Sequence, residues 1–184
     1  MKNMDIVIMG VGGQGSLLAS QILGELFTNA GLDVKVSEVH GMSQRGGSVV
    51  TMMRAGERVS TPLVAPGTAD LLVGMETIEG LRGLPFLSKQ GKLVASTQVV
   101  WPVSAKEKTV QSFPQGNGEI ILDAVALAKQ AGNEKTANTA VLGAVSTVMD
   151  FSDQEWHKAI QASVKPKTLD VNLKAFALGK QAAL

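Results

Sequence analysis

The sequence predicts an α/β protein with a Rossmann-like, mainly parallel sheet, an inserted hairpin and a helical C-terminal segment. Short apolar runs rich in β-branched residues alternate with helical patterns through the first half of the chain. A glycine-rich turn joins the first apolar run to the first helical pattern. Toward the C-terminus, apolar residues recur at helical spacing with little sign of further strands.

The N-terminal part is predicted to contain a strand, a helix and a second strand. Residues 5–9 (DIVIM) form a β-branched apolar run that ends in glycine, which is typical of a buried parallel strand. Residues 14–30 repeat apolar side chains at helical spacing, and Gly31 is expected to follow the helix end. Residues 33–39 form the next predicted strand. We therefore expect one right-handed β-α-β unit.

The predicted hairpin follows this unit. Residues 40–47 (HGMSQRGG) are polar and glycine-rich, which indicates a loop. Residues 48–54 and 58–63 then indicate two strands around a short turn. The alternating pattern resumes with a strand, a short helix and a strand at residues 69–74, 76–82 and 92–96.

The remaining segments are predicted to be helical. Residues 121–131 are amphipathic, and residues 138–149 are apolar on nearly every face, which indicates deep burial or an interface. Residues 152–155 (SDQE) form a capping-box pattern and predict the start of a further helix. A last helix is expected at residues 167–182.

Length and composition indicate a globular protein. The chain has 184 residues, 45% of them hydrophobic and 18% charged, and we expect one domain over residues 1–184. Lysine and arginine number 17 against 16 acidic residues, and no basic run is present, so nucleic acid is an unexpected partner. The N-terminus resembles neither a signal peptide nor a membrane span, so no membrane partner and a cytoplasmic location are expected.

The chain contains no cysteine. It therefore has no disulfide, no thiolate zinc site and no iron–sulfur cluster held by its own cysteines. If the protein takes part in electron transfer, the metal must be held by another chain. With only two histidines, a transition-metal site is not expected either.

The glycine-rich turn matches G-x-G-x-x-G between a predicted strand and a predicted helix, and its candidate site residues are Gly10, Gly12, Gly13, Gln14 and Gly15. In a dinucleotide site the glycines permit a tight turn, close approach of a pyrophosphate and close helix packing. Glu38, near the end of the second predicted strand, would then bind ribose. The alternative is a scaffold turn, or an anion site for another ligand.

A second polar segment follows Glu38, and its candidate site residues are His40, Ser43, Gln44, Arg45, Gly46 and Gly47. The paired glycines can expose successive amides to an anion, and the arginine offers a planar, charged fork to a carboxylate or phosphate. The alternative is an ordinary turn whose arginine pairs with a neighbouring acid or with a helix C-terminus. The histidine is a candidate for proton relay or substrate contact, with hydrogen bonding to the backbone as the alternative.

Together, residues 10–15 (GVGGQG) and 38–49 (EVHGMSQRGGSV) resemble the gamma-type subunits of the 2-oxoacid:ferredoxin oxidoreductases, and within that family the beta subunit of the indolepyruvate type. Residues 61–63 (TPL), 69–72 (ADLL) and 138–144 (NTAVLGA) also fit. The likeness spans nearly the whole chain, and it implies one gamma-type domain like those of pyruvate and ketoisovalerate oxidoreductases.

The resemblance implies a complex that oxidatively decarboxylates a 2-oxoacid, such as indolepyruvate or another arylpyruvate, to an acyl-CoA. Thiamine diphosphate, Mg and [4Fe–4S] clusters would belong to a large catalytic partner subunit, with CoA as co-substrate and ferredoxin as electron acceptor. This chain would bind no cofactor and be inactive alone. Its expected role is to complete the complex and its substrate or CoA channel, presenting the two glycine-rich segments there.

Two other functions compete with this interpretation. A free-standing dinucleotide-binding dehydrogenase would use Glu38 on ribose, but the chain has no tyrosine for a lysine–tyrosine pair and no length for a second, substrate-binding domain. A regulatory nucleotide-binding domain is compatible with the glycine-rich turn, but no other feature of the sequence supports it.

Overall fold

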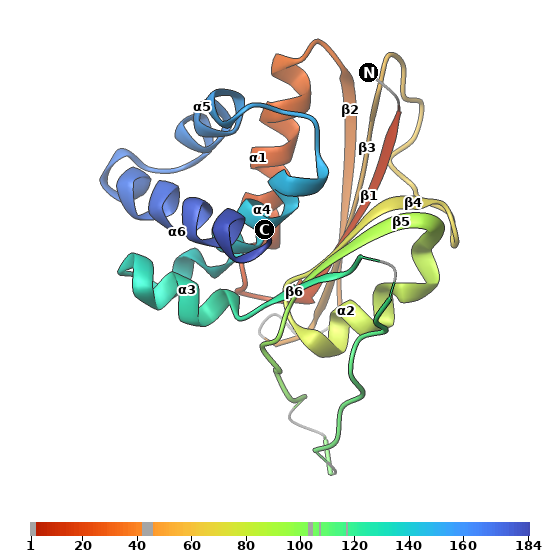
Figure 1. Cartoon of the computed structure of the whole chain (residues 1–184). Coiled ribbons are helices and arrows are strands. Elements are labelled where there is room, and N and C mark those ends of the chain that lie inside the picture. Colours follow the sequence, from red (N-terminus) through yellow and green to blue (C-terminus); the bar gives the residue numbers. More distant parts are fainter. Residues whose placement is uncertain (1–2, 42–45, 103–104, 107, 117) are drawn as a thin grey trace.

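The computed structural model describes residues 3–41, 46–102, 105–106, 108–116 and 118–184. Its strands form one sheet in the order β2-β3-β1-β4-β5-β6 (Figure 1). The strands are β1 (Met4–Val11), β2 (Asp33–His40), β3 (Ser48–Gly56), β4 (Ala69–Gly74), β5 (Leu87–Ser96) and β6 (Ile120–Leu122).

The sheet is mixed, and its parallel part runs through β1, β4, β5 and β6. Strand β3 is antiparallel to both of its neighbours, β1 and β2. The predicted fold class is therefore confirmed. The inserted hairpin differs from the prediction, because β3 pairs with β2 and not with residues 58–63. The two strands of the predicted β-α-β unit are not neighbours, because β3 lies between them.

The predicted strand at residues 58–63 is wrong. Both edges of β3 are already used by β1 and β2, so no edge of β3 is left to pair with this segment. Its backbone is instead held by side chains of the hairpin: the Val59 N–H donates to Asp33 Oδ2 at 3.0 Å. That bond and the nearby Lys35 lower the pKa of Asp33 below its ordinary value.

Helices cover both faces of the sheet (Figure 1). One face carries α1 and the C-terminal helices, and the other carries α2. The helices are α1 (Ser16–Asn29), α2 (Thr77–Gly83), α3 (Ala124–Ala131), α4 (Ala137–Val145), α5 (Asp153–Ser163) and α6 (Leu169–Ala182). Short 3₁₀ turns are η1 (Leu84–Phe86), η2 (Glu134–Thr136), η3 (Ser146–Val148) and η4 (Pro166–Thr168).

Most helix ends follow the sequence signals. Gly31 has φ 79° just after α1, as predicted for a residue that follows a helix end. The capping box of Ser152 and Glu155 is present at the start of α5. The predicted helix at residues 121–131 is wrong at its start, because residues 120–122 pair in parallel with β5 as strand β6. The helix begins only after Asp123, whose side chain caps it.

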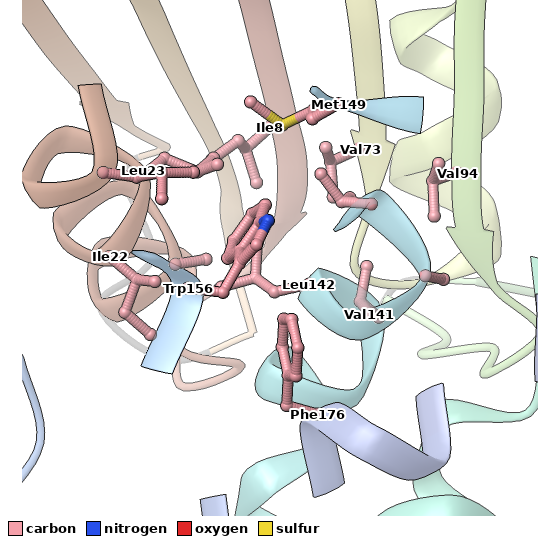
Figure 2. Close-up of a cluster of buried hydrophobic side chains, with 14 of the residues drawn as sticks. Ile8, Ile22, Leu23, Val73, Val94, Val141, Leu142, Met149, Trp156 and Phe176 are labelled. Carbon is pink, nitrogen blue, oxygen red and sulfur yellow. The ribbon is translucent and has the colours of Figure 1, made fainter. Parts of the chain in front are cut away.

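The main core lies between the sheet and the C-terminal helices. Figure 2 shows Trp156 between the sheet residue Ile8 and the side chains of Leu142 and Phe176. The two aromatic rings lie 5.4 Å apart between centroids. Helix α4 runs through the middle of this layer, and its residues 138–145 are all buried, as predicted.

Helices α4 and α6 approach so closely that glycine is required in each. A Cβ atom on Gly143 would lie 2.0 Å from the Phe176 carbonyl oxygen, and one on Gly179 would lie 1.8 Å from that of Ala140. The buried Thr139 hydroxyl also donates to Asn172 Oδ1 at 2.7 Å across this contact. Among the described residues, no helix is both long enough and apolar enough to cross a membrane.

Candidate functional site

The glycine-rich turn lies at the carboxyl end of β1, as predicted. Gly10 packs closely against the turn between β4 and α2, because a Cβ atom added to Gly10 would lie 2.9 Å from Met75 Cβ. Gly13 and Gly15 have φ of 97° and 79°, which favour glycine. Gly15 is also close to α4, because Asn138 Nδ2 donates to its carbonyl oxygen at 3.1 Å. The turn is thus set by backbone conformation and by contacts with two neighbouring elements.

The Gln14 side chain folds back over the turn. Its Oε1 accepts the Val11 N–H at 2.9 Å, and its Nε2 donates to Gln98 Oε1 at 3.2 Å. Gln98 lies just beyond β5, at the start of the long connection to β6 that projects from this edge of the sheet (Figure 1). Gln14 therefore joins the glycine-rich turn to that connection.

The second glycine-rich segment lies beside the first. The Gly12 N–H donates to the Gly47 carbonyl oxygen at 2.9 Å, and Gly46 has φ 72° on an exposed surface. The Gly41 N–H donates to the Ser48 carbonyl oxygen at 2.8 Å, which closes the base of the loop. The predicted site residues Ser43, Gln44 and Arg45 lie outside the described residues.

A cleft of about 370 Å³ opens between the glycine-rich turn and the start of α4. Its polar wall is rich in side-chain amides, from Gln14, Gln98, Asn133 and Asn138. Lys135 adds a cation, and the Glu134 carboxylate also lines the cleft, where it pairs with Lys129 Nζ at 3.6 Å. Helix α1 begins beside the cleft at Gly15. Its first-turn amides, like those of any α-helix, have no intrahelical acceptor, and no side chain at Gly15 caps them. This combination suits a polar or anionic ligand.

Sequence analysis did not assign the far wall of this cleft. Asn133, Lys135 and Asn138 lie more than a hundred residues from the glycine-rich turn, and only the fold brings them together. One sequence signal was available for Asn138, since a polar side chain opens an otherwise apolar helix. Gln98 gave no such signal.

The ribose-binding role considered for Glu38 is not supported by the fold. Because β3 separates β2 from β1, Glu38 is displaced two strand spacings, roughly 10 Å, from the strand that carries the glycine-rich turn. Its carboxylate is already engaged, by the Thr51 hydroxyl at 3.0 Å and by His40 Nε2 at 2.7 Å. His40 thus contacts a carboxylate rather than the backbone, and its side chain is 62% exposed.

No metal centre accompanies the cleft in the described part of the chain. No three histidine, cysteine, aspartate or glutamate side chains there lie close enough to hold an ion. Because the chain has no cysteine, it supplies no thiolate ligand for an iron–sulfur cluster.

A family model for pyruvate ferredoxin/flavodoxin oxidoreductase matches residues 5–182. The chain belongs to this family. It is 40% identical to the indolepyruvate oxidoreductase subunit IorB of Thermococcus kodakarensis, with 100% of this chain and 97% of that protein covered. It is 35% identical to the subunit of the same name from Archaeoglobus fulgidus, over 98% of this chain and 96% of that protein.

Solved structures agree with this assignment. The gamma subunit of a keto/oxoacid ferredoxin oxidoreductase from Geobacter sulfurreducens superposes with a TM-score of 0.77 at 25% identity, covering 98% of both chains. The pyruvate oxidoreductase subunit PORC from Thermotoga maritima gives 0.74 at 25% identity, over 98% of this chain and 97% of that one. The resemblance to gamma-type subunits inferred from the two glycine-rich segments is thereby confirmed.

Proposed function

We propose that this chain is the accessory subunit of an indolepyruvate-type 2-oxoacid:ferredoxin oxidoreductase. The observation that carries the proposal is the similarity of the whole chain, at 40% identity, to a subunit named for indolepyruvate oxidoreductase. The relatives are named as subunits, which implies a larger complex. The proposal also covers which chain holds the cofactors, which ligand reaches the cleft and the preference of the complex for arylpyruvates.

The cofactors are proposed to reside in a larger catalytic partner. The clusters of such an enzyme need cysteine thiolates, and this chain has none. Among the described residues, no three histidine, cysteine, aspartate or glutamate side chains cluster as a metal site. The chain would thus supply surface and cleft, while decarboxylation and electron transfer to ferredoxin take place on the partner.

The cleft beside the glycine-rich turn is the part proposed to meet the ligand. Amide side chains offer donors and acceptors without a fixed charge. Lys135 together with the start of α1 favours an anion, and the carboxylate of Glu134, which also lines the cleft, is paired with Lys129. A 2-oxoacid carboxylate and the phosphates of CoA both have this chemistry. In this proposal, the chain lines the route by which one of them reaches the partner's thiamine.

The alternative of a free-standing dehydrogenase fits less well. Its ribose-binding acid is displaced from the glycine-rich turn by β3, and the Val11 and Gly12 amides of that turn already donate to Gln14 and Gly47. A regulatory nucleotide-binding role has no observation in its favour.

A reconstitution experiment tests the proposal. The purified chain and the larger subunit, prepared separately, are assayed alone and mixed for ferredoxin reduction with indolepyruvate and CoA. We expect turnover only in the mixture, and faster turnover with indolepyruvate than with pyruvate or 2-oxoglutarate. We also expect the chain alone to bind no thiamine diphosphate in calorimetry.

Three outcomes would contradict the proposal. Turnover by the isolated chain would place catalysis in it, and tight binding of NAD or FAD would favour the dehydrogenase. Full activity of the larger subunit by itself would remove the need for this chain.

A further inference from the structure

The first turn of α2 carries two buried carboxylates. Glu76 is 0% exposed and Glu79 is 3% exposed. Glu76 caps the helix by accepting the Glu79 N–H, and its second oxygen accepts the Val100 N–H at 3.1 Å. Burying a carboxylate costs free energy unless hydrogen bonds compensate for the lost contact with water. The partners of both carboxylates therefore indicate what each one does in the fold.

The Glu79 carboxylate reaches across to the hairpin. One oxygen accepts from the Ser48 hydroxyl at 2.5 Å, and the other accepts from Arg82 Nη1 at 2.6 Å. Glu79 comes from a helix on one face of the sheet, while Ser48 is the first residue of β3. The contact therefore ties α2 to the exact point at which the second glycine-rich segment enters the sheet.

Ser48 is also the base of that segment. Its carbonyl oxygen accepts the Gly41 N–H, and the preceding carbonyl, of Gly47, accepts the Gly12 N–H. Among the contacts of the described residues, the hydroxyl contact joins this backbone junction to α2, outside the hairpin and the glycine-rich turn. It adds a side-chain contact to the backbone hydrogen bonds that position Gly47 and Ser48.

Helix α2, which carries Glu79, is itself closely packed against its neighbours. Gly80 and Gly83 let it lie close to its neighbours, where added Cβ atoms would fall 2.9 Å from the Phe113 ring and 2.6 Å from Leu72. A buried, charged acceptor forms a stronger and better-directed hydrogen bond than a neutral one. The side chain of Glu79 is thus fixed in place and held toward Ser48.

We propose that Glu79 is a positioning residue, which acts through Ser48 to fix Gly46 and Gly47 against the glycine-rich turn beside the cleft. This rests on the proposed function, in which both glycine-rich segments face the ligand route. Glu79 touches no ligand. It sets the position and the mobility of the backbone at Gly46 and Gly47, which faces the ligand route.

The test uses the reconstituted complex with Ser48→Ala, Ser48→Thr and a matched control, Ser146→Ala. Ser146 is also buried and loses a hydroxyl bond, to the Gly143 carbonyl oxygen at 2.6 Å, but it lies in the helical layer. We expect Ser48→Ala to raise the KM for CoA, for indolepyruvate or for both by about tenfold, with kcat within about twofold, as loss of a hydrogen bond to a charged group implies. Ser48→Thr keeps the hydroxyl and restores KM, and Ser146→Ala leaves KM unchanged.

Glu79→Gln provides the second arm. Because Glu79 and Ser48 act through one contact, the double variant should raise KM no further than the larger single effect. Amide hydrogen exchange in the assembled complex should speed up at Gly12 and Gly41 in Ser48→Ala, and not in Ser146→Ala.

Unchanged KM values in Ser48→Ala overturn the proposal. If the melting temperature falls while KM is unchanged, the contact between Glu79 and Ser48 is purely structural. Additive KM effects of the two substitutions also overturn it. Failure of the proposed function is distinguishable, because the wild-type chain would then fail to activate the larger subunit at all. The exchange measurement remains informative in that case, since it needs no turnover.

Discussion

Where α4 crosses α6, the two backbones are in direct contact at Gly143 and Gly179. At the carboxyl edge of the sheet, by contrast, the chain segments contact each other mainly through polar groups. Ser48 donates a hydrogen bond to Glu79, and Gln14 donates one to Gln98. The two glycine-rich segments are joined by the hydrogen bond from the Gly12 N–H to the Gly47 carbonyl oxygen. The helical layer is held by close packing of apolar atoms, which tolerates almost no change in volume. The cleft edge is held by single directed contacts, which can be lost one at a time. The difference suggests that substitutions in the two regions separate stability from activity.

The largest effect is expected at the helix crossing. Gly179→Ala places a Cβ 1.8 Å from the Ala140 carbonyl oxygen, so α6 must move away from α4. We expect a loss of roughly 4 kcal/mol or more in the free energy of unfolding, measured by urea denaturation.

The matched control for Gly179→Ala is Gly24→Ala, in the middle of α1, where an added Cβ has no neighbour within 4 Å. Because alanine favours helix over glycine, this variant should gain about 0.5–1 kcal/mol. Equal destabilisation by both substitutions would show that close packing is not what holds the helical layer.

A smaller effect on stability, but a large one on activity, is expected at Gly15. Gly15→Ala combines φ 79° with a Cβ 2.5 Å from Asn138 Nδ2, so both the turn and the cleft wall must shift. We expect a loss of about 1–3 kcal/mol in stability and a larger fractional loss of activity in the reconstituted complex. Gly13→Ala is the control, since it has φ 97° and open space and should cost only the backbone strain of about 1 kcal/mol. A Gly15→Ala variant as active as the wild type would break the link between this turn and function.

The smallest effect concerns the exposed capping box at the start of α5, whose hydrogen bonds lie outside both the helix crossing and the cleft edge. The Ser152 hydroxyl and N–H lower the pKa of Glu155 below its ordinary value of 4.5. A lowered folded-state pKa stabilises the fold above the unfolded-state pKa, and that contribution is lost as pH falls through the folded-state pKa. Ser152→Ala should therefore lower the melting temperature by about 2–4 °C at neutral pH, and the difference should narrow in acid. Ser163→Ala removes a hydroxyl that donates to the Ala159 carbonyl oxygen, a group that does not titrate, so its effect should not change between neutral pH and pH 4. A pH-independent Ser152 effect would exclude the carboxylate as its cause.

Much of the fold could be predicted because its signals are local. The apolar run of β1, the positive φ of Gly31 and the capping box at Ser152 depend on residues within one or two turns of each other. The errors occurred where pairing decided the outcome. Residues 58–63 have a strand-like composition but find no free edge of β3. Residues 121 and 122 lie at the start of a predicted helix but pair with β5.

The sequence by itself determined the α/β class, the two glycine-rich segments and the absence of cysteine, because composition and short-range pattern carry each of them. Tertiary structure alone decided that β3 separates Glu38 from the glycine-rich turn, and that Asn138 and Lys135 face Gln14 across a cleft. It also decided that Glu79 reaches Ser48. These contacts join residues far apart along the chain, and no local rule of spacing or propensity specifies which distant segments the folded sheet brings together.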